Sequence, residues 1–233
     1  MTYKYSLFCF LLALFTSIIF SANAQDFVVE PFTKISVRGQ VVINYVVSSE
    51  PEILTVKDEQ KSLVKYCVKN GTLKIKHTKL KPNKNKKAEL TISGKPLKEI
   101  CLRQGAVFNT GMVSLADTAK IRIASGSEIQ SKIKSQKLDA IVRSGSFCYL
   151  EGELSNLTAK VRSGSRLRCS GAIINKAYIK IAAGSFAAFK DNTDIEGKVT
   201  TGSELKLYGT GNTNPKVNTH THGKITTSNG DEL

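Results

Sequence analysis

The chain has 233 residues, five cysteines and a formal net charge of +15. It contains no C-x-x-C, H-E-x-x-H, G-x-S-x-G or phosphate-loop pattern, which excludes the metal, hydrolase and nucleotide sites that those motifs build. The positive charge favours an anionic partner such as lipopolysaccharide, acidic polysaccharide or extracellular DNA, although no specific nucleic-acid motif is present.

Residues 1–24 have the features of a secretory signal peptide. Lys4 precedes an apolar run from Leu7 to Phe20, and Ala22-Asn23-Ala24 forms a small-residue cleavage site before Gln25. We therefore expect an exported protein, in the periplasm, on the cell surface or outside the cell, with no transmembrane segment in the mature chain. An uncleaved anchor is the alternative, for which the apolar run is short.

Residues 25–96 contain strand-forming sequence without a clear period. Asn70-Gly71, the strongest two-residue hairpin signal, lies between the apolar segments Val64–Val68 and Leu73–Ile75. Apolar residues also alternate around Gly39. These alternating residues are Ile35, Val37, Val41, Ile43 and Tyr45. We expect this part to be an irregular β region of the same domain.

A repeat of about twenty residues dominates residues 97–225. Its glycines are spaced by 21, 19, 19, 20 and 18 residues, and most are followed by serine. A period near twenty residues is typical of a solenoid, in which each coil buries its apolar face against its neighbours. The six glycines are Gly105, Gly126, Gly145, Gly164, Gly184 and Gly202.

Apolar residues occupy the same offsets from each repeat glycine. Positions three and five before it, and three and five after it, are predominantly apolar. Because these offsets have period two, each coil should consist of two short strands joined at the Gly-Ser turn. A further apolar position lies seven before the glycine, and turn-like segments such as Lys134–Lys137 and Glu151–Glu153 precede it. The predicted fold is an all-β, right-handed parallel β-helix or β-solenoid forming one elongated domain over residues 25–233.

Several motifs, in order, resemble a known family. They are Phe32-x-x-Ile35-x-Val37-x-Gly39, Asn70–Ile75, Leu97–Gly105 and the Ser-Gly-Ser coils. The sequence is similar in these motifs to the putative auto-transporter adhesin, head GIN domain family of secreted bacterial proteins, common in the Bacteroidetes, over nearly all of residues 30–225. The resemblance implies a β-helical exported protein and supplies no catalytic residue.

Four cysteines follow the expected cleavage site. Cys148 and Cys169 should lie diagonally on adjacent strands, about 8 Å apart at Cα, which is beyond the usual disulfide limit of about 7 Å. We expect both to be buried thiols. The sequence leaves open whether Cys67 and Cys101 pair.

Outward-facing positions suggest a ligand surface of aromatic rings and arginines. Two and four residues past successive glycines, rings alternate with guanidinium groups, and two further arginines stack before the turn. Planar rings beside guanidinium groups suit sugar faces and carboxylate or phosphate groups. The predicted surface consists of Arg143, Phe147, Tyr149, Arg162, Arg166, Arg168 and Phe186. Ordinary cross-strand pairing, or burial beneath a partner, is the alternative interpretation.

We expect a non-enzymatic adhesin-like protein that binds surface polymers, such as an anionic glycan, or a surface protein. We expect no catalytic residue, metal or cofactor. One alternative is a structural, self-assembling envelope module, since open coil ends can stack to form homo-oligomers. A polysaccharide-active enzyme is a further alternative. It is the weaker one, because such enzymes use a pair of neighbouring carboxylates, whereas the outward carboxylates Glu128, Asp139 and Glu204 are widely dispersed.

Overall fold

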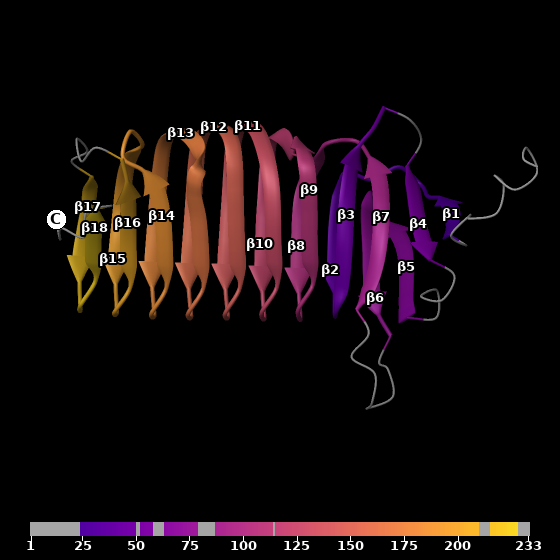
Figure 1. Ribbon diagram of the computed structural model, residues 1–233, viewed down its shortest axis with the longest axis horizontal. Coiled ribbons are helices and arrows are strands. Elements are labelled where there is room, and N and C mark those ends of the chain that lie inside the picture. Colours follow the sequence, from indigo (N-terminus) through magenta and orange to yellow (C-terminus); the bar gives the residue numbers. More distant parts are fainter. Residues whose placement is uncertain are drawn as a thin grey trace, which may run out of the picture.

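The computed structural model describes residues 24–49, 52–57, 63–78, 87–113, 115–209 and 215–227. In these ranges the protein is a long stack of β-strands without an α-helix (Figure 1). The predicted signal peptide lies outside the described residues except for Ala24, the first residue of strand β1.

The second half of the stack is the predicted parallel β-solenoid, in which successive coils follow one another in chain order (Figure 1). Each coil runs up one side of the stack and down the other. The strands are β8 (Leu97–Arg103), β9 (Val107–Val113), β10 (Leu115–Ala124), β11 (Glu128–Arg143), β12 (Phe147–Arg162), β13 (Arg166–Ala182), β14 (Phe186–Lys190), β15 (Asp194–Thr200), β16 (Glu204–Tyr208), β17 (Lys216–His220) and β18 (Lys224–Thr227).

Two sides of the stack are distinguished below. The β2 side contains the strands that lead into each glycine turn, and it is formed by β6, β2, β8, β10, the second halves of β11 to β13, β15 and β17. The β3 side contains the strands that leave the turn, and it is formed by β7, β3, β9, the first halves of β11 to β13, β14, β16 and β18.

The predicted apolar columns form the core between the two sides. Val142 pairs in register with Val161, and Val161 with Ile181, and all three are buried. The columns on the other side of the turn, represented by Cys148 and Leu167, are buried as well. Identical offsets stack directly because each coil adds one strand to each side, with about 4.8 Å between neighbouring strands.

The glycine turns form one edge of the stack, at the bottom of Figure 1. As predicted, the glycines adopt positive φ, for example 68° at Gly145. The residue before each glycine does so too, with φ of 58° at Ser144 and 56° at Thr201, which the sequence did not indicate. A Cβ atom on Gly145 would meet nothing within 4 Å, so its conformation and not lack of space requires glycine.

The serine that follows five of the six repeat glycines is buried, and hydroxyl groups of these serines form a ladder between coils. The backbone N–H of Ser146 donates to Oγ of Ser165 at 3.2 Å, and the backbone N–H of Ser165 donates to Oγ of Ser185 at 3.3 Å. The chain also bonds between coils through its backbone, since the N–H of Gly145 donates to the carbonyl of Ser163 at 3.0 Å. Each turn is therefore fixed by the next turn.

The opposite edge differs from the prediction in detail. The chain bends at pairs of consecutive poorly buried residues within the continuous strands β11 and β12, at Gln136-Lys137 and Ser155-Asn156. The predicted corner at Glu151–Glu153 is therefore placed too early. The bend follows the point where the period-two burial shifts by one residue, and this shift occurs after Leu154.

The first half of the described chain combines parallel and antiparallel pairing. The predicted hairpin is present, because β5 and β6 pair antiparallel around Asn70-Gly71. Strands β1 and β4, and β4 and β7, are antiparallel as well. The strands are β1 (Ala24–Val28), β2 (Lys34–Arg38), β3 (Val41–Val47), β4 (Ile53–Lys57), β5 (Val64–Lys69), β6 (Thr72–His77) and β7 (Ala88–Gly94).

The order of stacking differs from the order of the chain in this half. The coil formed by β2 and β3 lies between the β6–β7 coil and the β8–β9 coil, as Figure 1 shows. After β7 the chain therefore passes over the β2–β3 coil before it begins the regular stack. Tyr45 lies beneath this passage, and its hydroxyl donates to the carbonyl of Lys95 at 2.6 Å.

The four described cysteines are free thiols. Cys148 and Cys169 are buried, as predicted, and desolvation raises the pKa of Cys148 to about 12 and that of Cys169 well above its usual value. Cys67 and Cys101 lie in one register row, in which Cys67 pairs with Lys74, Lys74 with Ser36, and Ser36 with Cys101. Three strand spacings amount to about 14 Å, so this pair is too distant for a disulfide.

Candidate functional site

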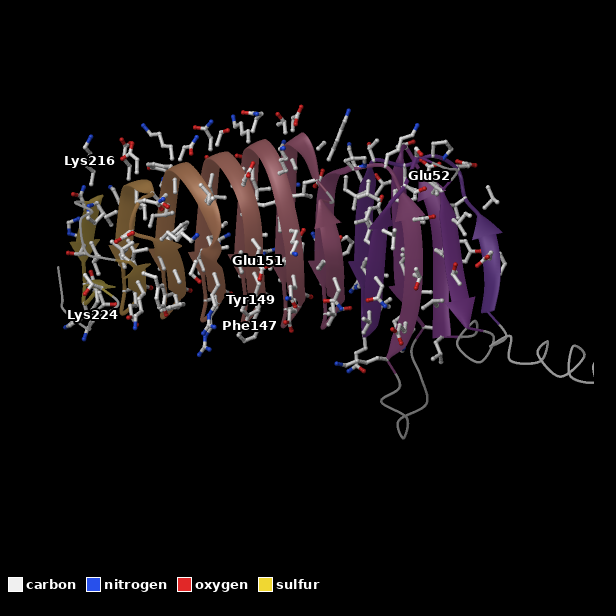
Figure 2. The ribbon with its side chains drawn as sticks, turned by 45° about the horizontal axis from the view of Figure 1, so that its top comes forward. Glu52, Phe147, Tyr149, Glu151, Lys216 and Lys224 are labelled. Carbon is white, nitrogen blue, oxygen red and sulfur yellow. The ribbon has the colours of Figure 1, made fainter. Side chains whose placement is uncertain are left out.

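The predicted ring and arginine columns lie in register on the β3 side. Arg166 of β13 pairs with Phe147 of β12 and with Phe186 of β14. The guanidinium carbon of Arg166 lies 5.8 Å from the centre of the Phe147 ring. Figure 2 shows Phe147, Tyr149 and Glu151 following one another on this face.

A second row runs beside the first. Arg168 pairs with Tyr149, and its guanidinium carbon lies 5.8 Å from the ring centre. Both arginines are exposed, and both rings are half-buried. Each cation–π contact contributes about 0.5–1 kcal/mol at an exposed site. The contacts hold the guanidinium groups against the rings while their N–H groups remain available to a ligand.

The other two predicted arginines lie on the β2 side. Arg143 and Arg162 pair in register at the ends of β11 and β12, immediately before the glycine turns. The strands on the two sides bury the faces that they turn towards each other, so their exposed residues face in opposite directions. The seven predicted residues therefore form two groups, which meet at the turn edge, instead of one flat patch.

One outward position differs from the prediction. Ala188 lies four residues past Gly184, in a column expected to face outward, yet it is only 1% exposed. The register places it between Arg168 and Lys206. A methyl group between two long side chains has little surface to expose.

The outward carboxylates remain apart. Glu128 and Glu204 belong to the row of Phe147, Arg166 and Phe186, and they lie at its two ends. Four strand spacings separate them, or about 19 Å, whereas paired glycosidase carboxylates lie within about 10 Å. Asp139 lies on the β2 side. In the described part of the chain, no group of three or more His, Cys, Asp or Glu residues could hold a metal ion.

A family model described as putative auto-transporter adhesin, head GIN domain, matches residues 31–211. The chain belongs to this family. The resemblance found in the sequence motifs is thereby confirmed, and the match covers most of the stack from the β2–β3 coil to β16. No curated protein has a matching sequence.

Solved structures share the fold of this head GIN chain. A putative adhesin from Bacteroides fragilis is 19% identical with a TM-score of 0.71, and the alignment covers 88% of this chain and 94% of the other. A putative adhesin from Parabacteroides merdae is 15% identical, with a TM-score of 0.71 and coverages of 88% and 95%. A putative lipid binding protein from Parabacteroides distasonis is 14% identical, with a TM-score of 0.59 and coverages of 88% and 95%.

These identities establish the fold alone. Membership of the adhesin family suggests an extracellular or surface location. Among the residues that the structure describes, none forms a helix long and apolar enough to cross a membrane.

The β2 side of the head GIN domain carries basic residues that the sequence analysis missed. Lys160, Lys180 and Lys198 pair in one register row, and all three are exposed. Tyr178 is 40% exposed, and the Nζ of Lys180 lies 5.6 Å from its ring centre. The signal was available, because these lysines occupy the column four residues before the glycine.

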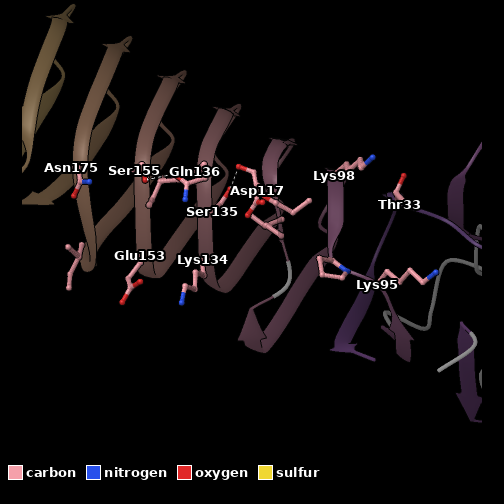
Figure 3. A pocket seen from close by; sticks show the side chains of 15 residues that line it. Thr33, Lys95, Lys98, Asp117, Lys134, Ser135, Gln136, Glu153, Ser155 and Asn175 are labelled. Carbon is pink, nitrogen blue, oxygen red and sulfur yellow. Dashed lines mark hydrogen bonds between the residues drawn. The ribbon is translucent and has the colours of Figure 1, made fainter. Parts of the chain in front are cut away.

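A groove follows the edge opposite the glycine turns, with a volume of about 790 Å³ (Figure 3). Polar residues of successive coils lie along it, and Oγ of Ser155 donates to Oε1 of Gln136 at 2.9 Å. Lys134 and Glu153 lie beside one another in register on its flank. Its charges are mixed, so it has no preference for an anion comparable to that of the arginine rows.

Proposed function

We propose that this head GIN protein is a non-enzymatic, exported binding protein whose surface ligand is an anionic polymer, in the first place an acidic glycan. The observation that carries the proposal is the register row in which Arg166 lies between Phe147 and Phe186, with Arg168 beside Tyr149 in the next row.

The geometry of these rows supports the proposal in two ways. The side chains repeat at the strand spacing of about 4.8 Å along a rigid sheet, which provides several adjacent contacts for an extended polymer. Rings bind the apolar faces of sugars, while each guanidinium group can donate two parallel hydrogen bonds to an anionic group. The family's adhesin description is consistent with such a surface.

The test compares the retention of two double variants with that of the parent protein on columns of an acidic polysaccharide and of neutral dextran. Arg166→Ala/Arg168→Ala should elute from the acidic column at markedly lower salt, because two ligand contacts are lost. Lys65→Ala/Lys74→Ala removes the same charge from exposed positions on strands β5 and β6, away from the arginine rows, and should elute close to the parent. Equal retention of the arginine variant and the parent contradicts the proposal. Cleavage of the bound polymer would contradict its non-enzymatic part.

Self-assembly is the second candidate, and the last coil favours it. β17 pairs with β15 and β18 pairs with β16, and no described strand continues the stack beyond them. Unpaired strand edges accept further strands. Light scattering over a range of protein concentrations tests this candidate, since a constant monomer mass rejects it.

A further inference from the structure

A second feature of the β2 side is a hollow at the turn edge with a volume of about 360 Å³. It extends over four neighbouring coils, from the β2–β3 coil into the regular stack. Its lining consists of three arginines and small or neutral polar residues, and no carboxylate belongs to it. The residues are Arg38, Arg103, Gln104, Ala124, Ser125, Arg143 and Ser144.

The hollow exists because one side chain in an arginine row is short. Arg38 pairs with Arg103, and Arg103 pairs with Ala124. The next coil places Arg143 at the same position, two residues before its glycine. Arg103 and Arg143 are thus two strand spacings apart, or about 10 Å. The short side chain of Ala124 lies between them and belongs to the lining of the hollow, although it is only 7% exposed.

The polar groups around the hollow are donors with few internal partners. Nε of Arg38 donates to Oε1 of Gln104 at 2.8 Å, which orients this guanidinium group. Within the described ranges, neither Arg103 nor Arg143 forms an ion pair. Glu99, four residues before Arg103 on the same strand, is paired with Arg122.

The turn conformation adds two exposed hydroxyl-bearing residues. Ser125 and Ser144 have φ of 59° and 58°, and both are exposed at the turn edge. Their backbone carbonyls are used within the ladder, since Ser144 O accepts from Gly126 N–H and Ser125 O accepts from Gly105 N–H. Both serines belong to the lining of the hollow.

We propose that this hollow is a binding site for an oxyanion of an anionic polysaccharide, namely a sulfate ester or a uronic carboxylate. Three positive groups without a neighbouring carboxylate repel one another, and a bound oxyanion removes that repulsion. Guanidinium groups bind such anions with paired hydrogen bonds. The inference rests on the proposed function and deepens it, because it assigns the charged group of the polymer to a site distinct from the ring rows.

The variant Ala124→Arg distinguishes the effect of the shape of the site on binding from the effect of its charge. It adds one positive charge and fills the hollow, and the row tolerates arginine since Arg143 and Arg162 occupy it in the next two coils. We expect about tenfold weaker binding of a heparin-derived hexasaccharide by calorimetry. Unchanged or tighter binding would show that charge alone governs affinity and would overturn the proposal.

The double variant Arg103→Gln/Arg143→Gln removes two of the three guanidinium groups and their charge, and Lys216→Gln/Lys224→Gln is its charge-matched control. The first should weaken hexasaccharide binding by at least about tenfold, and the control by less than about twofold. An oligogalacturonate of equal length is tested in parallel. If the arginine variant weakens the binding of one oligosaccharide more than the lysine variant does, the proposal is supported, and that oligosaccharide identifies the anionic group. If the arginine and lysine variants weaken binding equally, the proposal is rejected.

Two further measurements complete the test. The binding of duplex DNA and of anionic vesicles is measured for the same variant. If Arg103→Gln/Arg143→Gln weakens either of these as much as it weakens oligosaccharide binding, the assignment to polysaccharide is overturned. If the parent binds no acidic polysaccharide, the proposed function fails, and inorganic sulfate then tests the hollow itself. Sulfate should shift the amide resonances of Ser125 and Ser144 in the parent and not in the double variant; identical shifts in both reject the site.

Discussion

The two halves of this molecule use the same coil but order it differently. From β8 to β18 each coil lies on the one before it, so chain order and stacking order agree. In the first half, the earliest coil, β2–β3, is enclosed between β6–β7 and β8–β9. Antiparallel strands β1, β4 and β5 complete that end of the stack (Figure 1).

The difference shows that the repeat in the sequence specifies which residues of a coil are buried, but not which other coil stacks on it along the axis of the solenoid. Ile35 and Val37 of β2 occupy the same core columns as Ile100 and Leu102 of β8, with which they pair. Nothing in their spacing distinguishes a consecutive coil from an enclosed one. The enclosed coil instead joins the two halves, because both of its faces are covered.

The largest expected effect concerns the joint between the halves. Phe108 of β9 is fully buried and stacks on Tyr45 of β3, with ring centres 5.7 Å apart. Phe108→Ala should destabilise the protein by about 3–5 kcal/mol and should separate the unfolding of the two halves. Denaturant unfolding followed by circular dichroism measures this. Phe186→Ala, at a half-buried outward position, is the control. A loss no larger than that of the control contradicts the assigned joint.

The regular half depends on close approach of backbones at certain glycines. A Cβ atom on Gly197 would lie 1.9 Å from the carbonyl oxygen of Ile179, and Gly197 has φ of 147°. Gly197→Ala should therefore cost about 2–4 kcal/mol. Gly184→Ala is the matched change at a site with φ of 66° and open space, and it should cost only about 1–2 kcal/mol. Equal losses in urea titrations would show that steric contact contributes nothing.

The hydroxyl ladder is confined to the regular half, since the turn at Gly39 is followed by Gln40. Ser165→Ala removes the acceptor of the Ser146 N–H in a fully buried position. We expect a loss of about 1–2 kcal/mol. Ser163→Ala, in the same turn, should be nearly neutral, because Ala183 already occupies the equivalent position with φ of 58°. Thermal unfolding of the two variants measures this difference. If both variants lose the same stability, the turn simply does not tolerate alanine, and the hydroxyl ladder is not the cause.

The smallest effect comes from comparing the turns of the two halves. Asn70-Gly71 and Thr201-Gly202 both have two consecutive residues with positive φ. Asparagine tolerates this conformation, whereas β-branched threonine is strained in it. Thr201→Asn should stabilise the protein by about 0.5 kcal/mol. A decrease in stability would mean that the threonine side chain has a compensating role in its turn.

Particular residues show how far the sequence could be interpreted. The columns represented by Val142, Val161 and Cys148 were placed in the core from spacing alone, because period-two burial is a local property. The positive φ of Ser144 was missed because residue type alone does not indicate it. Ala188 was misplaced since its exposure depends on side chains of neighbouring coils.

The candidate surface divides in the same manner. The sequence identified Arg166 beside Phe147 because both lie at one offset in successive repeats. It did not show that Arg143 faces away from them. Nor did it show the hollow at Ala124, whose first wall is Arg38, a residue from outside the regular repeat.

The sequence by itself determined the coil: its length, its two strands, its glycine turn and the residues that it buries, since all of these follow from contacts repeated every twenty residues. The tertiary structure decided which coils are neighbours, above all the enclosure of β2–β3, and thereby which charged side chains share a surface. The physical reason is that stacking energy depends on the burial of a coil's open faces, and any coil with matching columns can supply that burial.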